Sequence, residues 1–337
     1  MHEARFFEKL EDNKVKCHLC AHECTIDPGK RGICAVRENR DGTLYSIVYG
    51  RLISGNPDPI EKKPLFHFLP GTRSYSIATV GCNMQCQHCQ NADISQYPGY
   101  NNGNIAGTNL TPAQVVAKAV ASGSASIAYT YTEPTIFAEF ARDTAGLARE
   151  KGLRNVFVSN GFMTEASATA MAAVLDGDNI DLKSFSDSFY RKVCKARLQP
   201  VLDTITRMKK LGVWVEVTTL LIPGLNDSDE ELRDIAQFLN ATGPEIPWHV
   251  TAFYPTYKML DRPPTPLATL RRAREIGLAA GLRYVYTGNI PGDPGENTFC
   301  PGCDRLLIER SGFTIRQNRI VDGACPECGA RIDGVWQ

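Results

Sequence analysis

The chain has 337 residues, enough for one large α/β domain with small additions. Its 37 Lys and Arg residues equal its 37 Asp and Glu residues, so no overall charge attracts it to nucleic acid or an anionic membrane. Residues 1–9 lack an apolar segment of signal-peptide length, and no later stretch reaches the roughly 18 apolar residues of a membrane span. We therefore expect a soluble, cytoplasmic protein that needs neither a membrane nor nucleic acid as a partner.

Twelve cysteines are the most informative part of the composition. In a cytoplasmic chain they are better explained as metal ligands than as disulfides. All but Cys194 fall into three groups, each within a short segment: Cys17, Cys20, Cys24 and Cys34; Cys82, Cys86 and Cys89; Cys300, Cys303, Cys325 and Cys328. Cys194 lies in a helical segment, 189–194, and is expected to be a small buried apolar residue.

Residues 1–72 are predicted to form an N-terminal cysteine-rich module and a linker. The Cys-x2-Cys-x3-Cys-x9-Cys spacing of the module offers four thiolates, and Gly29 and Gly32 let the chain turn between them. Zinc and iron–sulfur clusters both accept four thiolates, so the spacing leaves both open. Zinc is the favoured interpretation and an auxiliary cluster the alternative. The proline-rich segment 56–71 is expected to have no regular structure.

Residues 73–290 alternate short β-branched segments with longer amphipathic ones, which predicts strand–helix units and a parallel sheet. The expected strands are 75–80, 126–131, 155–159, 179–182, 213–221, 248–253 and 283–286. Unusual residues follow successive strands, at the ends where a parallel barrel builds its active site. We predict an α/β fold, a partial (β/α)6-type TIM barrel enclosing a lumen, with small cysteine-rich metal-binding modules at both termini.

Two helix starts can be placed within this region. Thr111 is expected to be an N-cap, with Pro112 as the first helical residue. The inner face of that helix is expected to carry Val115, Val116, Ala119 and Val120. The cap of a later helix is expected at Asp227, Ser228 or Asp229.

A Cys-x3-Cys-x2-Cys loop, Cys82 to Cys89, follows the first expected strand of this region. A four-iron cluster normally takes four Cys thiolates, so three leave one iron open to a ligand from outside the protein. A zinc site closed by His88 is the alternative, but zinc sites normally combine two Cys-x2-Cys hooks.

This loop resembles the cluster loop of the radical S-adenosylmethionine (SAM) superfamily. The resemblance implies a [4Fe–4S] cluster on Cys82, Cys86 and Cys89, with its free iron chelated by the amino and carboxylate groups of SAM. It also implies that the reduced cluster splits SAM into methionine and a 5′-deoxyadenosyl radical, which abstracts hydrogen from a substrate. The protein would hold, aim and shield this chemistry. His88 departs from the aromatic residue that often precedes the third cysteine.

Glu133 lies in a Thr-Glu-Pro turn at the end of an expected strand. Its position resembles the Gly-Gly-Glu stretch that receives the SAM amino group in radical SAM enzymes. Here Tyr131 and Thr132 replace the two glycines. A helix N-cap is the alternative role for Glu133.

Asp181 and Lys183 occupy alternate positions of a strand, so their side chains share one face of the sheet. The Asp181-Leu182-Lys183 stretch resembles one in glycyl-radical activating enzymes. The resemblance implies that Lys183 neutralises the SAM carboxylate and that Asp181 orients it or holds a cation. A buried structural ion pair is the alternative.

Two further residues are expected at the same pocket. Asn160 follows the preceding strand in Ser159-Asn160-Gly161. Thr218, with Thr219 beside it, is expected to offer a hydroxyl to the ribose and adenine of SAM. Threonine is also an ordinary strand residue, which is the alternative reading.

Residues 291–337 are predicted to form a zinc-ribbon-like module that begins at a turn-rich hinge, 290–295. Its two Cys-x2-Cys hooks lie 21 residues apart, close to zinc-ribbon spacing, and 306–321 between them is expected to be a hairpin. Structural zinc is the favoured interpretation for Cys300, Cys303, Cys325 and Cys328, and an auxiliary cluster the alternative.

Taken together, these motifs resemble one family along nearly the whole chain. It is the radical SAM enzyme of the AmmeMemoRadiSam system, a relative of pyruvate formate-lyase activating enzymes. The resemblance implies partnership with AMMECR-domain and Memo-like proteins and an electron donor such as flavodoxin or ferredoxin.

Three functions follow from these observations. The first is a radical SAM enzyme acting on a small molecule or on a protein of its own system. The second is an activase that places a radical on a glycine of a partner protein. The third is a binding protein whose iron–sulfur and zinc sites are structural. No residue of the chain is assigned as catalytic.

Overall fold

The computed structural model describes every residue except Pro291, so the predicted hinge at 290–295 lies partly outside the described residues. Its centre is an eight-stranded sheet in the order β16-β15-β14-β13-β12-β11-β9-β8. The strands are β8 (Ser54–Pro59), β9 (Arg73–Ala78), β11 (Ser126–Tyr129), β12 (Arg154–Ser159), β13 (Gly177–Asp181), β14 (Trp214–Leu221), β15 (Trp248–Ala252) and β16 (Val285–Gly288). All neighbours are parallel except β8 and β9. This confirms the parallel sheet expected from the alternating pattern.

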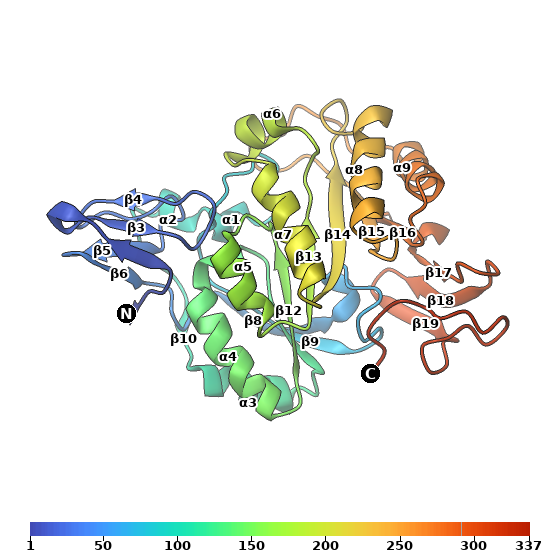
Figure 1. Ribbon diagram of the computed structural model, residues 1–337, viewed down its shortest axis with the longest axis horizontal. Coiled ribbons are helices and arrows are strands. Elements are labelled where there is room, and N and C mark those ends of the chain that lie inside the picture. The colour runs from blue at the N-terminus through green and yellow to red at the C-terminus, as the bar shows by residue number, and fades with distance from the viewer. Residues whose placement is uncertain (291) are drawn as a thin grey trace.

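Helices link the parallel strands and cover the outer side of the sheet (Figure 1). They are α3 (Pro112–Ala121), α4 (Ala138–Glu150), α5 (Glu165–Ala172), α7 (Gln199–Lys210), α8 (Asp229–Thr242) and α9 (Leu267–Ala279). In the described part of the chain, six such crossovers lead to a last parallel strand, β16. Within the same residues, β16 and β8 form the two edges of an open sheet, so the barrel is not closed.

The capping predictions are confirmed, and one packing prediction is wrong. Thr111 caps α3 by accepting a 3.2 Å hydrogen bond from the Gln114 amide, and Ser228 caps α8. Val120, expected on the inner face of α3, is 51% exposed. At 3.6 residues per turn it lies roughly 140° around the helix from the buried Val115, outside the apolar stripe.

The proline-rich segment forms regular structure, contrary to the prediction. Its first residues belong to β8, which pairs with β9 along its length, and a 3-10 turn, η2 (Ile60–Lys62), follows. Pro57 and Pro59 occupy alternate positions of this strand, and β8 has a partner on one side alone. An edge strand tolerates proline because one row of its amides has no partner strand to bond.

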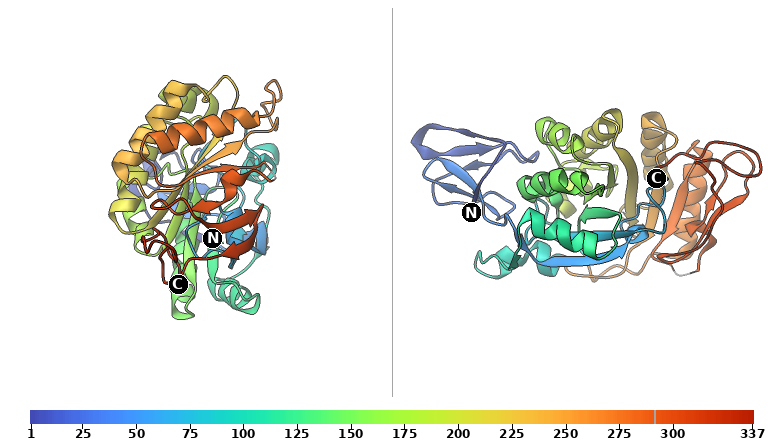
Figure 2. Two further views of the ribbon diagram at one scale, coloured as in Figure 1. Left: turned by 90° about the vertical axis from the view of Figure 1, so that its right-hand side faces the viewer. Right: turned by 90° about the horizontal axis from the view of Figure 1, so that it is seen from below.

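Small β modules lie at opposite ends of the molecule (Figures 1 and 2). The N-terminal module has two three-stranded sheets, of β1 (His2–Glu3), β6 (Thr43–Ser46) and β5 (Arg37–Arg40), and of β2 (Phe7–Lys9), β3 (Val15–Cys17) and β4 (Thr25–Ile26). The C-terminal module has β17 (Thr298–Phe299), β18 (Leu306–Ser311) and β19 (Thr314–Asn318). The expected hairpin between the last cysteine hooks is therefore confirmed as β18 and β19.

The remaining elements are short. They are β7 (Arg51–Leu52), which pairs with β10 (Thr108–Asn109), the helices α1 (Ala92–Ser95), α2 (Tyr97–Tyr100) and α6 (Asp187–Phe189), the 3-10 turns η1 (Glu11–Asn13), η3 (Pro134–Phe137) and η5 (Pro294–Glu296), and a π-helical turn, η4 (Tyr190–Cys194). Among the described helices, none combines the length and the apolar character that crossing a membrane would take.

Candidate active site

A cavity of about 410 Å³ lies where the parallel strands end. Its lining includes Cys82, Cys86 and Cys89 from the loop after β9. It also includes Asn160 after β12, Asp181 and Lys183 at the end of β13, and Thr218 on β14. Loops and side chains at the carboxyl ends of parallel strands meet at one edge of a sheet, which is why residues so far apart in sequence share this cavity.

The cysteine loop is fixed by backbone contacts on both sides. The amides of Gln85 and Gln87 donate to the carbonyls of Cys194 and Val193, at 2.9 and 3.0 Å. Gly81, just before the loop, has a φ of +101°. A Cβ atom there would come within 2.6 Å of Val36 and 3.0 Å of the Cys34 carbonyl, so only glycine fits.

The three loop cysteines do not pack against one another but line an open space. Among the described residues, two groups bring three or more ligand atoms within 4.8 Å of one another, and neither combines Cys82, Cys86 and Cys89. All three nevertheless line the same cavity. A single metal ion needs its ligands in near contact, whereas a cubane of irons and sulfides separates them. The spacing of these three cysteines therefore suits an iron–sulfur cluster.

One of those two groups was missed by sequence reasoning. Cys194 is buried, as predicted, but its thiol also lies against Cys86 and His88. The hydrogen bond from Cys194 lowers the pKa of Cys86 and raises that of Cys194. Cys194 does not line the cavity. No local signal could have linked these residues, because they are far apart in the sequence.

His88 is a neutral side chain at the cavity wall. It is buried, and among the described residues its Nδ1 atom has no hydrogen-bond partner. Burial, and then the charge of Lys183, lowers the pKa of His88 to about 3. This ring nitrogen is an unused hydrogen-bonding group close to the cavity wall, with its own surface buried.

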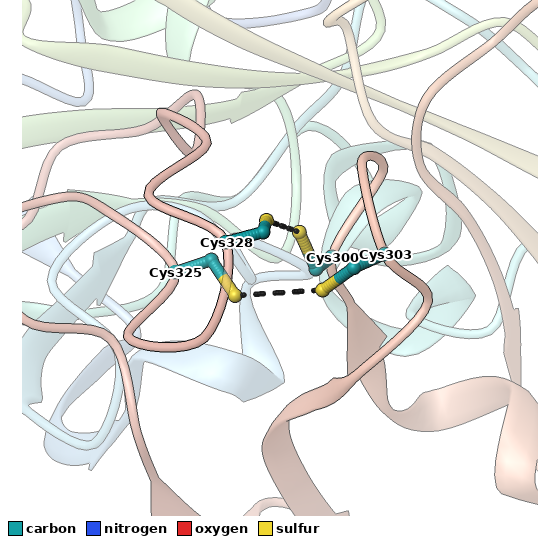
Figure 3. A group of neighbouring side chains, drawn as sticks. All are labelled: Cys300, Cys303, Cys325 and Cys328. Atoms are coloured by element: carbon teal, nitrogen blue, oxygen red, sulfur yellow. Dashed lines mark hydrogen bonds between the residues drawn. The ribbon is translucent and has the colours of Figure 1, made fainter.

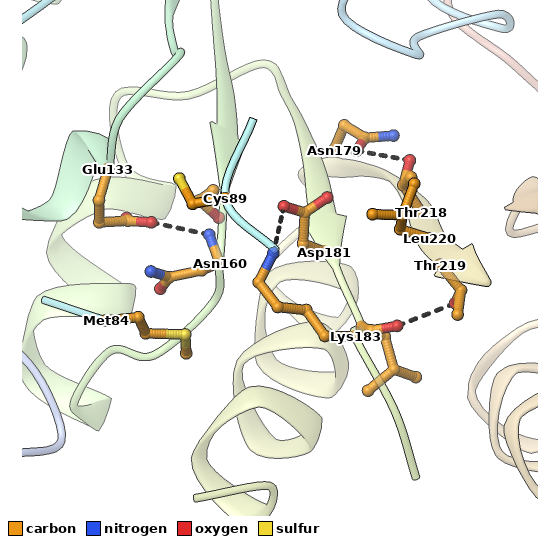
Figure 4. Close-up of polar contacts among 12 residues, drawn as sticks. Met84, Cys89, Glu133, Asn160, Asn179, Asp181, Lys183, Thr218, Thr219 and Leu220 are labelled. Carbon is orange, nitrogen blue, oxygen red and sulfur yellow. Dashed lines mark hydrogen bonds and ion pairs between the residues drawn. The ribbon is translucent and has the colours of Figure 1, made fainter. Parts of the chain in front are cut away.

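Asp181 and Lys183 form an ion pair in the cavity, with Lys183 Nζ 2.8 Å from Asp181 Oδ2 (Figure 4). Burial lowers the pKa of Lys183, but the Asp181 carboxylate and then the negative charge of Cys86 outweigh it, and the net pKa is raised. Lys183 therefore stays cationic beside the cysteine loop. Both side chains line the cavity, as expected, although β13 ends at Asp181 and Lys183 lies two residues beyond the strand.

Asn160 connects the third parallel strand to the cysteine loop. Its Nδ2 donates to Asn83 Oδ1 at 2.7 Å and lies 3.8 Å from Cys82 Sγ. Its Oδ1 accepts from the Phe162 amide at 3.0 Å. The side chain is 6% exposed, so these bonds orient both its amide atoms. Asn160 therefore faces the expected pocket and also holds the first cysteine of the loop.

Glu133 does not line the cavity, in contrast to the expectation that it receives the SAM amino group. One carboxylate oxygen accepts from the Thr135 amide and hydroxyl, at 3.0 and 2.6 Å. The other accepts from the Asn160 amide at 2.8 Å, as Figure 4 shows. The side chain is completely buried, and burial raises its pKa to about 7. The geometry favours the N-cap role, because Glu133 precedes η3 and its oxygens already have donors.

The two threonines of β14 point to different places. Thr218 lines the cavity and donates to Asn179 Oδ1 at 2.9 Å (Figure 4). Thr219 donates to the Leu182 carbonyl and accepts from Trp248, so it is part of the core. This difference follows from the alternation of side chains along a strand.

The wall beyond the cysteine loop carries residues that sequence reasoning did not select. Tyr131 lines the cavity in a left-handed conformation, with φ at +65°, where glycine is normally favoured. Its hydroxyl bonds Asp58, which also accepts from the buried Lys63 at 2.9 Å. Burial lowers the pKa of Lys63 to about 8. Phe313, at the turn between β18 and β19, reaches the same cavity.

The C-terminal cysteines form the second tight group. All four sulfurs lie within 4.8 Å of one another (Figure 3). Cys300 and Cys328 sulfurs are 3.6 Å apart, and those of Cys303 and Cys325 3.7 Å. Tetrahedral zinc with bonds of about 2.3 Å places its sulfurs roughly 3.8 Å apart. The set is therefore sized for one metal ion.

The N-terminal cysteines have a looser arrangement. Cys17 and Cys34 are buried, and Cys20 and Cys24 are half-buried. Among the described residues, no three of these thiols lie within 4.8 Å of one another. They are therefore not closed around a single ion in the way the C-terminal set is.

Two observations define the class of this protein: the cavity with three cysteines on the loop after the first parallel strand, and the similarity to known sequences. The chain belongs to the radical SAM superfamily. The model of that superfamily matches residues 76–239. The chain is 48% identical over 336 residues to uncharacterized protein MJ0808 of Methanocaldococcus jannaschii, covering 99% of each chain. It is also related to pyruvate formate-lyase activating enzymes. It is 23% identical over 237 residues to pyruvate formate-lyase 1-activating enzyme of Escherichia coli, covering 64% of this chain and 93% of that enzyme.

Solved structures agree on the fold. The crystal structure of Streptococcus suis SuiB bound to S-adenosylmethionine aligns with a TM-score of 0.51 and 13% identity, over 72% of this chain and 56% of that one. At this identity the match shows a shared fold alone.

Proposed function

We propose that this chain cleaves SAM reductively at a [4Fe–4S] cluster held by Cys82, Cys86 and Cys89, to take a hydrogen atom from a substrate. One observation carries the proposal. Three cysteine side chains that are too widely spaced for one ion share a cavity with the Asp181–Lys183 pair. Cys194 lies behind Cys86 and outside the cavity, so one corner of the cluster is free for SAM.

When bound and reduced, the cluster supplies the electron that splits SAM into methionine and a 5′-deoxyadenosyl radical. The chain's own residues hold and orient the reactants. Lys183 attracts the SAM carboxylate, and Asp181 keeps the Lys183 ammonium in place at 2.8 Å. Thr218, the partner of Asp181 in the pairing of β13 with β14, offers a hydroxyl beside this pair, and Asn160 positions Cys82. Glu133 acts indirectly, by fixing the Asn160 backbone at 2.8 Å.

The open sheet serves in this proposal as a partial barrel whose concave side holds the reaction. Water must be kept from a carbon radical, and a cavity of about 410 Å³ walled by strands and loops provides the shelter. The C-terminal cysteines hold structural zinc in this proposal, because their sulfur spacings of 3.6 and 3.7 Å match one tetrahedral ion.

A second candidate is an activase that forms a radical on a glycine of a partner protein. The relationship to pyruvate formate-lyase activating enzymes favours it. In the alternative, the substrate is a small molecule or a protein of the AmmeMemoRadiSam system, with AMMECR-domain and Memo-like partners. Either enzyme needs an electron donor such as flavodoxin or ferredoxin.

The test is SAM cleavage by anaerobically reconstituted, reduced protein. Methionine and 5′-deoxyadenosine are expected in equal amounts, and Cys82→Ala, Cys86→Ala and Cys89→Ala are each expected to abolish both. Cys303→Ala is the matched control, because it removes a cysteine outside the cavity and is expected to retain cleavage below its lowered thermal midpoint. Wild-type protein with a verified cluster but no cleavage would support the structural binding protein instead.

The two candidate enzyme functions can be distinguished by the fate of the radical. The activase predicts a persistent glycyl signal by electron paramagnetic resonance (EPR) on a partner protein. Isotope transfer from substrate into 5′-deoxyadenosine without such a signal would remove the activase.

A further inference from the structure

A compact set of metal ligands lies beside the cluster loop. Cys86, His88 and Cys194 each offer one ligand atom, and these three atoms lie within 4.8 Å of one another. Within the described residues, the other set as tight as this is that of the four C-terminal cysteines. Zinc, with bonds of about 2.3 Å to sulfur and about 2.0 Å to nitrogen, places its ligand atoms roughly 3.5 to 3.8 Å apart. The three side chains are therefore close to the spacing that a single ion requires.

Backbone contacts set the distance between the loop and Cys194. The Gln85 amide donates to the Cys194 carbonyl at 2.9 Å. The Gln87 amide donates to the Val193 carbonyl at 3.0 Å. These bonds lie on either side of Cys86 and join the loop to the π-helical turn η4, which ends at Cys194. Turns of this kind are rare and occur frequently at functional sites, and here the turn brings the ligands together before any ion binds.

The three side chains are buried, yet an ion can reach them. Cys86, His88 and Cys194 are 8%, 4% and 0% exposed. Cys86 and His88 line the cavity, so an ion that enters the cavity meets two of the three ligands directly. Among the described residues, the buried Nδ1 atom of His88 has no hydrogen-bond partner, so the fold gives this ring nitrogen no other role.

The chemistry of the set favours a divalent ion that prefers sulfur. Two thiolates balance the charge of one divalent ion, and a buried site is stable when its charges are balanced. Asp181 and Lys183, the ion pair on the same cavity wall, are 2.8 Å apart and offset each other. Two thiolates and an imidazole are ligands typical of zinc, and three protein ligands leave its fourth position for water.

From this geometry we infer that Cys86, His88 and Cys194 bind one zinc ion in protein that has not yet received its cluster. Cys86 cannot serve both metals, so zinc at this site prevents assembly of the cluster. That second half rests on the proposed function, which assigns Cys86 to the cluster. Zinc replaces the protons of the two thiols, and no electron is transferred. The loop can therefore accept iron only after zinc has left.

The zinc content of the reduced, iron-free full chain tests the site. After equilibration with zinc under anaerobic conditions and removal of weakly bound ions, the wild type is expected to hold about one more zinc per chain than Cys194→Ser. His88→Gln is expected to lose the same ion. The terminal cysteine sets are unchanged in all three proteins and contribute equally to each count. Equal zinc contents in the wild type and Cys194→Ser would overturn the inference.

Cys89→Ala is the matched control for Cys194→Ser. It removes a cysteine of the cluster that lies outside the compact set, so it is expected to lose the cluster and keep the additional zinc. Cys194→Ser is expected to do the reverse, because Cys194 does not line the cavity. If Cys194→Ser does not fold, Cys89→Ala is compared with His88→Gln. Equal zinc contents in these two variants would mean that the ion lies elsewhere and would refute the site.

Competition between the two metals is tested by anaerobic reconstitution with iron and sulfide. Preloading with zinc is expected to slow cluster formation roughly tenfold or more in the wild type and to leave its rate unchanged in Cys194→Ser. Equal slowing in both proteins would refute the exclusion. Failure of the proposed function is distinguishable, because zinc is counted without SAM. Protein that binds this zinc but never cleaves SAM would overturn the proposed function and leave the zinc site standing.

Discussion

The substitution Glu133→Gln separates two roles of this residue, the capping of η3 and the binding of SAM. Burial raises the pKa of this carboxyl from 4.5 to about 7. Between these two pH values the unfolded chain is ionised there while the folded chain keeps the proton, so the stability of the wild type falls as pH rises. At 1.36 kcal/mol per pKa unit, the full cost above pH 7 is about 3 kcal/mol.

The glutamine variant lacks this titration. Relative to Glu133→Gln, the wild type is therefore expected to lose about 2 to 3 kcal/mol of unfolding free energy between pH 5 and pH 8. Urea unfolding followed by circular dichroism at several pH values measures the difference. SAM affinity of the variant is expected to stay within about threefold of wild type, because the side chain does not line the cavity. Parallel pH profiles, or a tenfold loss of SAM affinity, would refute the reasoning.

Three more substitutions test other parts of the structure. Lys183→Met should weaken SAM binding by roughly 10- to 100-fold, since a hydrogen bond to a charged group contributes about 1.5 to 3 kcal/mol, and Lys183→Arg should lose less; equal affinities would remove Lys183 from the SAM site. Phe313→Ala should leave the anaerobic iron content unchanged but speed loss of the cluster in air, because this side chain covers the cavity from the C-terminal hairpin; an unchanged rate would contradict that cover. Cys325→Ser should release zinc and lower the thermal midpoint without loss of iron, as checked by metal analysis and calorimetry; an unchanged midpoint would mean that the metal does not stabilise the module.

The parts of the site that the sequence predicted are those with local causes. The spacing of Cys82, Cys86 and Cys89 belongs to one loop, and the alternation of Asp181 and Lys183 follows from strand geometry. The spacing and the alternation are both present in any fold that contains this loop and this strand. The positions of the parallel strands were predictable for the same reason, since buried strands of a parallel sheet are continuous apolar segments.

The parts that the sequence did not predict depend on distant contacts. Glu133 before Pro134 can cap η3 or face a ligand, and the Asn160 amide decides between them from 27 residues away. Cys194 meets Cys86 through the turn at η4. Phe313 reaches the cavity because the C-terminal module docks at the edge of the sheet. The prolines of β8 led to the wrong prediction of irregular structure, because the sequence does not reveal which strand will lie at an edge of the sheet.

These distant contacts explain how an open sheet can enclose a cavity. Glu216 and Thr218 are two residues apart on β14, so they face the same side of the sheet. Glu216 accepts the amides of Phe66 and His67 at 3.0 and 2.8 Å, which holds the linker against the base of that face, while Thr218 lines the cavity.

The linker is in turn clamped by the C-terminal module. Buried Arg310 on β18 donates to the Phe66 carbonyl at 2.9 Å, and the same hairpin carries Phe313 to the cavity wall. Because one hairpin reaches both the linker and the cavity wall, metal binding by the C-terminal cysteines is expected to stabilise both. The sheet itself leaves its two edges open, and the linker and the C-terminal hairpin add Lys62, Pro64 and Phe313 to the wall of the cavity.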